Sequence, residues 1–304
     1  MSGGGKRKTE EGKRNLEPSP TFPAGSALRF PFPVSRSPGL IGPFRRLWRQ
    51  RTLVAALARR ELVARYRGGV LGFFWSIANP LLLLLVYATV FRLVFAPRTD
   101  IRGPYALFLF AGVLAWGFVS SALLDAAETF RANGPLLRKT TAAPEVFPAV
   151  AVLARFAHLA LAVPVLAAAI GVAAARGAVH PTAAAIQFPV AVILLAGTVL
   201  GMSLVVSAFS VHFGDVRDLL QNLLTLTFFL TPVLYPVDAA PERLRRFLWL
   251  NPFTSFFVAI HESVFFFRPI GGQVWLGMLV ATSLSLALGG AVFERLRDSI
   301  AEEA

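Results

Sequence analysis

The stretch "VLGFFWSIANPLLLLLVYATVF", residues 70–91, contains 22 residues and no charged side chain. About 20 helical residues are enough to cross a hydrocarbon core of roughly 30 Å. A buried helix of a soluble protein can also be apolar on every side. The chain as a whole, however, is 55% hydrophobic and only 15% charged, and similar windows follow. The stretch therefore predicts a membrane-spanning helix within an integral membrane protein.

Further apolar windows of sufficient length predict additional spans. The third predicted span is interrupted only by Arg155 and His158, and Arg155 lies close enough to one end for its side chain to reach the membrane surface. With the first window, the sequence predicts six spans in total. The five further windows are residues 105–124, 147–175, 183–213, 219–237 and 271–293.

Residues 238–270, between the fifth and sixth windows, are apolar and aromatic without forming a clean span. Pro252 and the adjacent pair His261 and Glu262 interrupt them. Two short helices, at the membrane surface or re-entrant, fit this pattern better than a seventh span. We expect them to lie outside the cytoplasm and to gate the exit.

The distribution of basic residues predicts the orientation. With six spans both termini lie on one side, and that side holds 22 of the 30 Lys and Arg residues. The positive-inside rule then places both termini in the cytoplasm, in a multi-pass protein of the cytoplasmic (inner) membrane. The net charge of +13 arises largely in residues 1–70, so nucleic-acid binding is not needed to explain it.

The chain divides into four expected regions, within an all-α integral membrane fold of six transmembrane helices. Apolar residues between Phe44 and Leu62 gather in one arc of a helix that carries Trp48 and many arginines, which predicts an amphipathic helix at the cytoplasmic membrane interface. The regions are residues 1–43, a Gly-, Pro- and Ser-rich disordered cytoplasmic tail; 44–67, the interface helix; 68–295, the six-span permease domain; and 296–304, a cytoplasmic C-terminus.

Three stretches resemble the permease subunits of ABC transporters that export O-antigen, capsule or teichoic-acid polysaccharides. They are "RRELVARYRGGVLGFFWSIANPLLLLLVYATVF" at 59–91, "FGDVRDLLQ" at 213–221 and "TPVLYPVDAAPERLRRFLWLNPFTSF" at 231–256. The resemblance covers roughly residues 44–295 and offers no function for the tail. It implies a homodimer with a channel at the dimer axis, two copies of a separate ATPase subunit that hold ATP and Mg²⁺, and a lipid-linked glycan substrate.

The sequence contains no phosphate-binding loop of the form G-x-x-x-x-G-K-[ST], so energy must come from another chain or from an ion gradient. We expect no catalytic residue, metal site or cofactor in this chain. An ion-driven secondary transporter is one alternative, but it normally needs ionisable groups at mid-membrane depth. A membrane-embedded glycosyltransferase is another, for which only Asp215 with Asp218 offers acidic residues near a membrane face.

Aromatic residues suit a channel for sugar chains, because ring faces offer broad contact that does not select one register. Pro80 removes a helical hydrogen bond and Asn79 is costly against lipid, so the first span is expected to kink and face protein or the channel. The resemblance implies that spans one and five line the channel, although each aromatic could instead face lipid. The expected lining residues are Phe73, Phe74, Trp75, Asn79, Tyr87, Phe91, Phe228, Phe229 and Tyr235.

Two further sites are expected on the cytoplasmic side. Residues 125–147 form the largest internal connection there, at the position of the family's coupling helix. The expected ATPase contacts are Glu128, Arg131, Asn133, Leu136, Leu137, Arg138 and Lys139. Two arginines and two glycines, Arg65, Arg67, Gly68 and Gly69, are expected where the pyrophosphate headgroup of the substrate enters, because guanidinium groups grip phosphate with paired hydrogen bonds. The alternative role for these arginines is to set topology only.

Overall fold

The computed structural model describes residues 41–66, 74–93, 104–139 and 142–303. All of them belong to one unit, Pro38–Ala304, and the expected tail therefore lies almost entirely outside the described residues. The described elements are all helices. They are α1 (Gly42–Arg49), α2 (Arg51–Tyr66), α3 (Trp75–Leu93), α4 (Tyr105–Lys139), α5 (Val146–Ala175), η2 (Ala183–Ile186), α6 (Gln187–His212), α7 (Val216–Phe229), η3 (Val237–Ala239), α8 (Glu242–Leu248), α9 (Thr254–Val264) and α10 (Gly272–Glu303).

Four described helices are long and apolar enough to cross a membrane: Tyr105–Gly134, Val146–Ala175, Ala183–His212 and Gly272–Arg297. They coincide with predicted spans two, three, four and six, and they make the chain a multi-pass membrane protein. The first predicted span corresponds to α3, whose described apolar part is the shorter Ala78–Val90. The fifth corresponds to α7, which has 14 residues. The number of six spans therefore stays a prediction.

Several helix boundaries differ from those that hydropathy suggested. Helix α4 continues past Leu124 to Lys139, through much of the expected 125–147 connection. Helix α7 ends at Phe229, three residues before Pro232, because a proline disfavours helical backbone in the residue before it. Pro232 therefore follows a helix end and does not bend a continuous helix. The segment expected as one interface helix forms two, α1 and α2, separated at Gln50.

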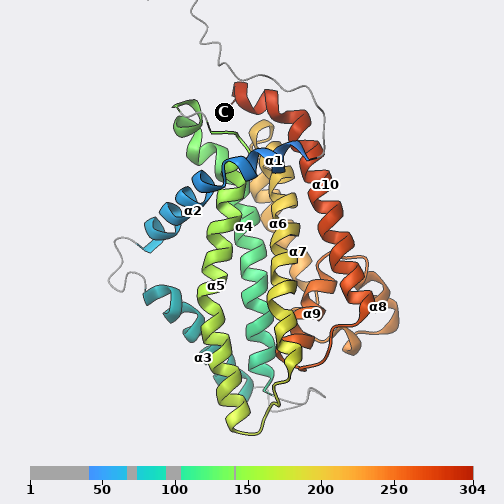
Figure 1. The fold of residues 1–304 in the computed structure, drawn as a ribbon. Helices are drawn as coiled ribbons and strands as arrows, with labels where there is room; N and C mark the ends of the chain where they lie inside the picture. Colours follow the sequence, from blue (N-terminus) through green and yellow to red (C-terminus); the bar gives the residue numbers. More distant parts are fainter. Residues whose placement is uncertain (1–40, 67–73, 94–103, 140–141, 304) are drawn as a thin grey trace, which may run out of the picture. The chain divides into compact units, whose positions relative to one another are not determined.

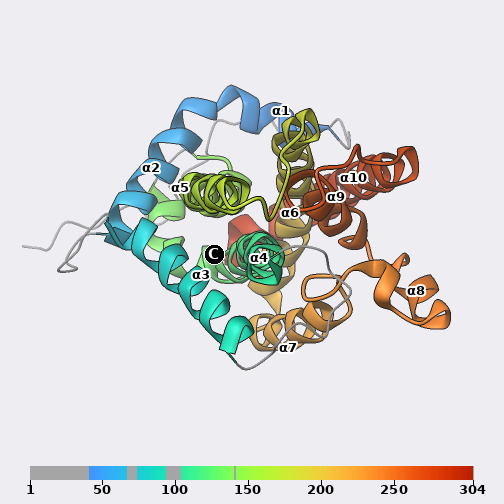
Figure 2. The ribbon, with the colours of Figure 1, turned by 90° about the horizontal axis from the view of Figure 1, so that it is seen from below.

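Helix α4 lies at the centre of the bundle, against α3, α5, α6, α7 and α9 (Figure 2). Helix α2 packs on α5, and α6 packs along α10. We call the end that carries α1 and the last turns of α10 the upper end, and the end that carries α8 and α9 the lower end (Figure 1).

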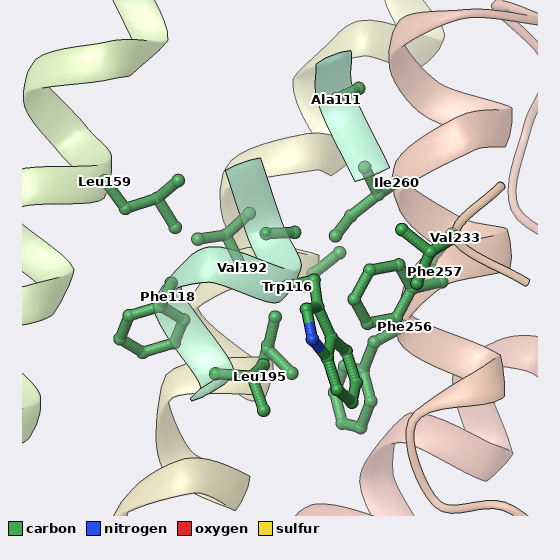
Figure 3. Packing of buried hydrophobic residues seen from close by; sticks show 14 of the residues in the cluster. Ala111, Trp116, Phe118, Leu159, Val192, Leu195, Val233, Phe256, Phe257 and Ile260 are labelled. Carbon is green, nitrogen blue, oxygen red and sulfur yellow. The ribbon is translucent and has the colours of Figure 1, made fainter. Parts of the chain in front are cut away.

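The main core lies between α4, α5, α6 and α9 (Figure 3), and on its α9 side aromatic side chains pack against one another. The Trp116 ring of α4 lies 5.8 Å from Phe253 and 5.9 Å from Phe257, centroid to centroid. Phe256 and Phe257 have no exposed surface. Such rings bury large apolar areas. Helix α9, within the segment 238–270 where two short helices were expected, is thus largely buried in the bundle, which fits the re-entrant alternative better than a surface location.

Helices α6 and α10 approach each other closely through glycines. A Cβ atom at Gly201 would lie 2.3 Å from the carbonyl oxygen of Ser285, so only glycine fits there. The hydroxyls of Thr198 and Thr282 lie 3.0 Å apart, and Ser285 Oγ donates to the Thr198 carbonyl at 2.7 Å. Small residues and hydroxyl pairs are typical of helix contacts inside membranes. Both glycines of the Gly197-x-x-x-Gly201 spacing lie at this contact.

Candidate functional site

The upper end is held together by Arg46 of α1. Its guanidinium donates to the carboxylate of Glu145, directly before α5, and to the carboxylate of Glu294 in α10. The Glu145 side chain is fully buried, and that of Arg46 is 24% exposed. Although partial burial opposes the charge of Arg46, the two carboxylates raise its pKa above the ordinary value. One side chain therefore joins three elements.

A second contact holds the segment that follows α4. Gln50 Oε1, at the break between α1 and α2, accepts a hydrogen bond of 3.1 Å from the Ala143 backbone N–H. On the same face, Val54 of α2 belongs to a small apolar cluster with Val146 and Val150 of α5. The chain between α4 and α5 is thus anchored to α1 and α2.

Ion pairs tie α4 to its other neighbours. Arg155, near the upper end of α5, donates to both carboxylate oxygens of Asp125, at 2.5 and 2.8 Å. Arg217 of α7 pairs with Glu128 at 2.7 Å. Arg131 donates to the Gly214 carbonyl at 3.0 Å. A displacement of this part of α4 would therefore pull on α5 and on the turn between α6 and α7.

A cavity of 310 Å³ opens beside these contacts, between α2, α4 and α5. We call it the upper cavity. Its wall is mostly polar on α4 and mixed on α2, and it includes the expected coupling residues Glu128 and Asn133. Its lining residues are Leu57, Arg60, Glu61, Ala64, Asp125, Glu128, Thr129, Ala132, Asn133, Phe147, Val150 and Ala151. A partner that docks here would contact α2 and α4 together.

Of the other expected coupling and headgroup residues, the described ones lie in the last turns of α4 and of α2. The side-chain amide of Asn133 donates to the Thr129 carbonyl of its own helix at 2.9 Å. Four expected coupling residues, Leu136, Leu137, Arg138 and Lys139, form the last residues of α4, with their side chains outside the described part. Arg65 belongs to the last turn of α2, and Arg67, Gly68 and Gly69 lie outside the described residues.

The expected channel residues separate into exposed and packed groups. Phe74 is 71% exposed, Phe229 is 60% exposed, and Asn79 is also exposed. Tyr87 and Phe228 are half-buried against the main core. Tyr235 is half-buried at the lower end, where its hydroxyl donates to the Phe229 carbonyl at 3.0 Å. Trp75 and Phe91 lie on α3 with undescribed side chains, and Phe73 lies outside the described residues.

Exposed leucines form a stripe on each of the two helices that carry these residues. On α7 the exposed leucines are Leu219, Leu223 and Leu226, followed by Leu230 directly after the helix; on α3 the exposed positions are Leu81, Leu82, Leu85 and Val86. Leucines three or four residues apart on α7, and two pairs four residues apart on α3, place each set on one helix face. Among the described residues, nothing covers these two faces.

Sequence reasoning missed the Arg46 cluster. Glu145 and Glu294 lie 99 and 248 residues from Arg46 along the chain, so no local pattern connects them. One signal was available: Glu145 is an acidic residue directly before a long apolar helix, a position where a buried charge needs a partner.

Several long apolar helices, with charged side chains paired at one end, define a multi-pass membrane protein. The ABC-2 type transporter family matches residues 52–265, and the chain belongs to that family. It is 33% identical over 261 residues to an O-antigen export system permease protein, RfbA, of Myxococcus xanthus, covering 85% of this chain and 97% of that protein. It is also 29% identical over 252 residues to an RfbA of Klebsiella pneumoniae, covering 82% and 94%. The chain is thus a transporter membrane subunit and not an enzyme.

Proposed function

We propose that this chain is the channel-forming permease subunit of an ABC exporter that moves lipid-linked polysaccharide across the cytoplasmic membrane. The similarity to O-antigen export permeases over 97% of the Myxococcus protein carries the proposal. A separate ATPase subunit, present in two copies, holds ATP and Mg²⁺ and supplies the energy. The upper end faces the cytoplasm, in line with the excess of basic residues on that side.

The ATPase docks on the end of α4 and on the upper cavity. A push on α4 from this side reaches α5 through Asp125 and Arg155, and α7 through Glu128 and Arg217. Arg46 keeps α1, α5 and α10 together while this happens. These contacts support α4 as the element that passes motion from the ATPase into the membrane.

Two copies of the chain form the channel between their α3 and α7 faces. The exposed leucine stripes on these helices would contact the second copy or lipid, and the exposed Phe74, Asn79 and Phe229 beside them would contact the sugar chain. Cross-linking of single cysteines is a direct test, because the sequence contains no cysteine. A cysteine at Leu226 should give disulfide-linked dimers, whereas one at lipid-facing Ile193 of α6, which is 61% exposed, should not.

Arg65 and Arg67 hold the pyrophosphate of the lipid carrier as it enters. If they act only as topology signals, lysine should replace them freely. If they grip phosphate through paired hydrogen bonds, Arg65→Lys with Arg67→Lys should insert and assemble but lose much of the stimulation of ATP hydrolysis by lipid-linked glycan.

The decisive experiment is purification of the chain from its host with whatever it binds, followed by reconstitution in vesicles. We expect a co-purified ATPase whose ATP hydrolysis drives uptake of lipid-linked glycan. Recovery without any ATPase, together with transport by the chain alone under an ion gradient, would contradict the proposal and favour a secondary transporter. Labelling of a cysteine at Glu242 from the cytoplasmic side only would contradict the orientation.

A further inference from the structure

A second cavity, of 550 Å³, lies at the lower end between α4, α9 and the segment that follows α7. We call it the lower cavity. Its volume falls within the range of about 300–1,000 Å³ typical of small-molecule sites. Of the expected channel residues, only Tyr235 lines it. The residues proposed above for ATPase coupling and for dimer formation lie elsewhere.

Aromatic rings form part of its wall. Tyr105 of α4 and Phe266, in the segment after α9, both line the cavity. Their ring centroids lie 5.9 and 6.2 Å from that of Phe108. The hydroxyls of Tyr105 and Tyr235 are already used, since they donate to the carbonyls of Leu234 and Phe229. The rings are therefore held in place by the protein, and what they can offer a ligand is apolar surface.

Charged side chains form another part of the cavity wall. Asp238, Glu262 and Arg268 line the cavity, and the Arg268 guanidinium carbon lies 5.4 Å from the Phe266 ring centroid. Within the described residues, no hydrogen bond or ion pair engages the carboxylate of Asp238 or of Glu262. Burial raises the pKa of Glu262, Arg268 opposes this shift, and Asp238 adds to it. Two carboxylates and a guanidinium group thus lie close together beside aromatic rings, where a ligand could bond to them.

The residue directly before Arg268 has an uncommon backbone conformation. Phe267 has a φ of 53°, which bulky side chains rarely adopt. Thr182 Oγ1 donates to the Phe267 carbonyl at 2.7 Å, and Gln187 Oε1 accepts from the Ile270 N–H at 2.9 Å. The loop between α5 and α6 therefore fixes the segment that points Phe266 and Arg268 at the cavity. Strained backbone of this kind is concentrated at binding sites.

We propose that the lower cavity binds one sugar unit of the exported glycan, with its ring against aromatic side chains and its hydroxyls bonded to Asp238, Glu262 and Arg268. The inference rests on the proposed function for the presence of a glycan. It adds a site that selects a register. Aromatic surfaces alone let a chain slide, whereas donors and acceptors at fixed positions hold one unit. The lower cavity would thus recognise a particular sugar at the exit.

The test uses the full chain purified with its ATPase in lipid nanodiscs. Ala239 lines the cavity and is exposed, so Ala239→Cys places a small reactive group there. Ala183→Cys is the matched control, exposed at the same end and outside the cavity. Alkylation by a fluorescent maleimide is followed with oligosaccharide released by mild acid from the surface glycan of the host, or with dextran oligosaccharide of equal length.

We expect the host oligosaccharide to slow alkylation of Ala239→Cys several-fold and to leave Ala183→Cys unaffected. Glu262→Gln, in a variant that keeps the wild-type melting temperature, should remove the protection. Equal rates with and without host oligosaccharide would overturn the site. Equal protection by dextran, or by Ca²⁺ alone, would also overturn it, because the cavity would then not recognise the exported sugar.

The two proposals fail in different ways. If the lower cavity is not protected but ATP still drives glycan transport, only the sugar site is wrong. If the glycan neither stimulates the ATPase nor is transported, the proposed function itself is wrong.

Discussion

The two ends of the bundle are held together by different forces. At the upper end, charged side chains join elements far apart in the sequence, as Arg46 does with Glu145 and Glu294. At the lower end, Phe108 stacks on His261 with ring centroids 3.7 Å apart. The one ion pair that the described residues place there lies within α8, between Arg246 and Glu242. Separating the helices at the lower end exposes aromatic rings, whereas separating them at the upper end leaves charges unpaired. The helices of the upper end should therefore move together as a rigid body.

The largest expected effect is at the upper end. Arg46→Ala should lower the free energy of unfolding by about 3 kcal/mol, because it leaves the fully buried Glu145 without its partner. The measurement is thermal or denaturant unfolding of the purified protein in detergent. Adding Glu145→Gln and Glu294→Gln should restore much of the loss, since no buried charge then remains unpaired. A variant Arg46→Ala that unfolds like the wild type would remove the contrast between the two ends.

A comparable but smaller loss is expected from crowding the lower end. A Cβ atom at Gly112 would lie 2.7 Å from the Val233 carbonyl oxygen and 3.1 Å from His261 Nε2. Gly112→Ala should therefore destabilise the protein by about 1–3 kcal/mol. Gly117→Ala is the control on the same helix, because nothing lies within 4 Å of its Cβ position. Equal melting temperatures for the two variants would show that the groups around Gly112 can shift to accept a methyl group without loss of stability.

Loss of the hydrogen bond of His261 should lower stability less than Arg46→Ala or Gly112→Ala does. Its Nε2 lies 3.2 Å from the Phe108 carbonyl oxygen. His261→Phe keeps a ring on Phe108 and loses this bond, so we expect a loss of about 1 kcal/mol at neutral pH. His261→Leu, which also loses the stacked ring, is the comparison. A loss as large as that of Arg46→Ala would mean that polar contacts hold both ends equally.

The same side chain makes a prediction about pH. Complete burial lowers the pKa of His261 to about 3, from an ordinary value of 6.5. The unfolded chain therefore binds a proton between these values and the folded chain does not, so stability contributed by this site falls as pH decreases below 6.5. Unfolding of wild type and His261→Phe at pH 7 and pH 5 should show a steeper decline for the wild type. Identical declines would exclude the buried neutral histidine.

The smallest effect is expected where a pair is exposed. The side chains of Glu128 and Arg217 are 47% and 51% exposed. Glu128→Gln should therefore change stability by less than about 1 kcal/mol. If α4 passes motion from the ATPase, transport per ATP hydrolysed should nevertheless fall. Arg246→Gln in α8, whose pair is 81% and 77% exposed, is the control that should leave both quantities unchanged.

Much of the fold was predictable because hydropathy reports burial in lipid. The windows beginning at residues 105, 147, 183 and 271 coincide with long apolar helices within one residue of their starts. Hydropathy does not report where a helix ends. Helix α4 continues to Lys139 through Gly134 and Pro135, which disfavour helix, so neither hydropathy nor helix propensity predicts its end. Helix α7 ends early because of Pro232, although its apolar window continues.

The candidate sites were less predictable. Glu128, Arg131 and Asn133 were expected near a partner, and the structure places Glu128 and Asn133 at the upper cavity. The same reasoning could not link Arg46 with Glu294, because pairing across 248 residues depends on how α1 lies over α10. The lower cavity was missed for the same reason. Its charged residues come from three separate elements and share no periodic pattern.

The length of α4 makes it a mechanical lever. Its 35 residues span about 52 Å, well beyond a hydrocarbon core of about 30 Å. Tyr105 at its first turn borders the lower cavity, and Asn133 near its last turns borders the upper one. A rigid rod of this length that tilts by about 5° about its midpoint displaces each tip by about 2 Å, in opposite directions. The upper cavity lies on the α2 and α5 side of α4 and the lower cavity on the α9 side (Figure 2). Such a tilt would therefore narrow both cavities or widen both, with no signal needing to pass from side chain to side chain.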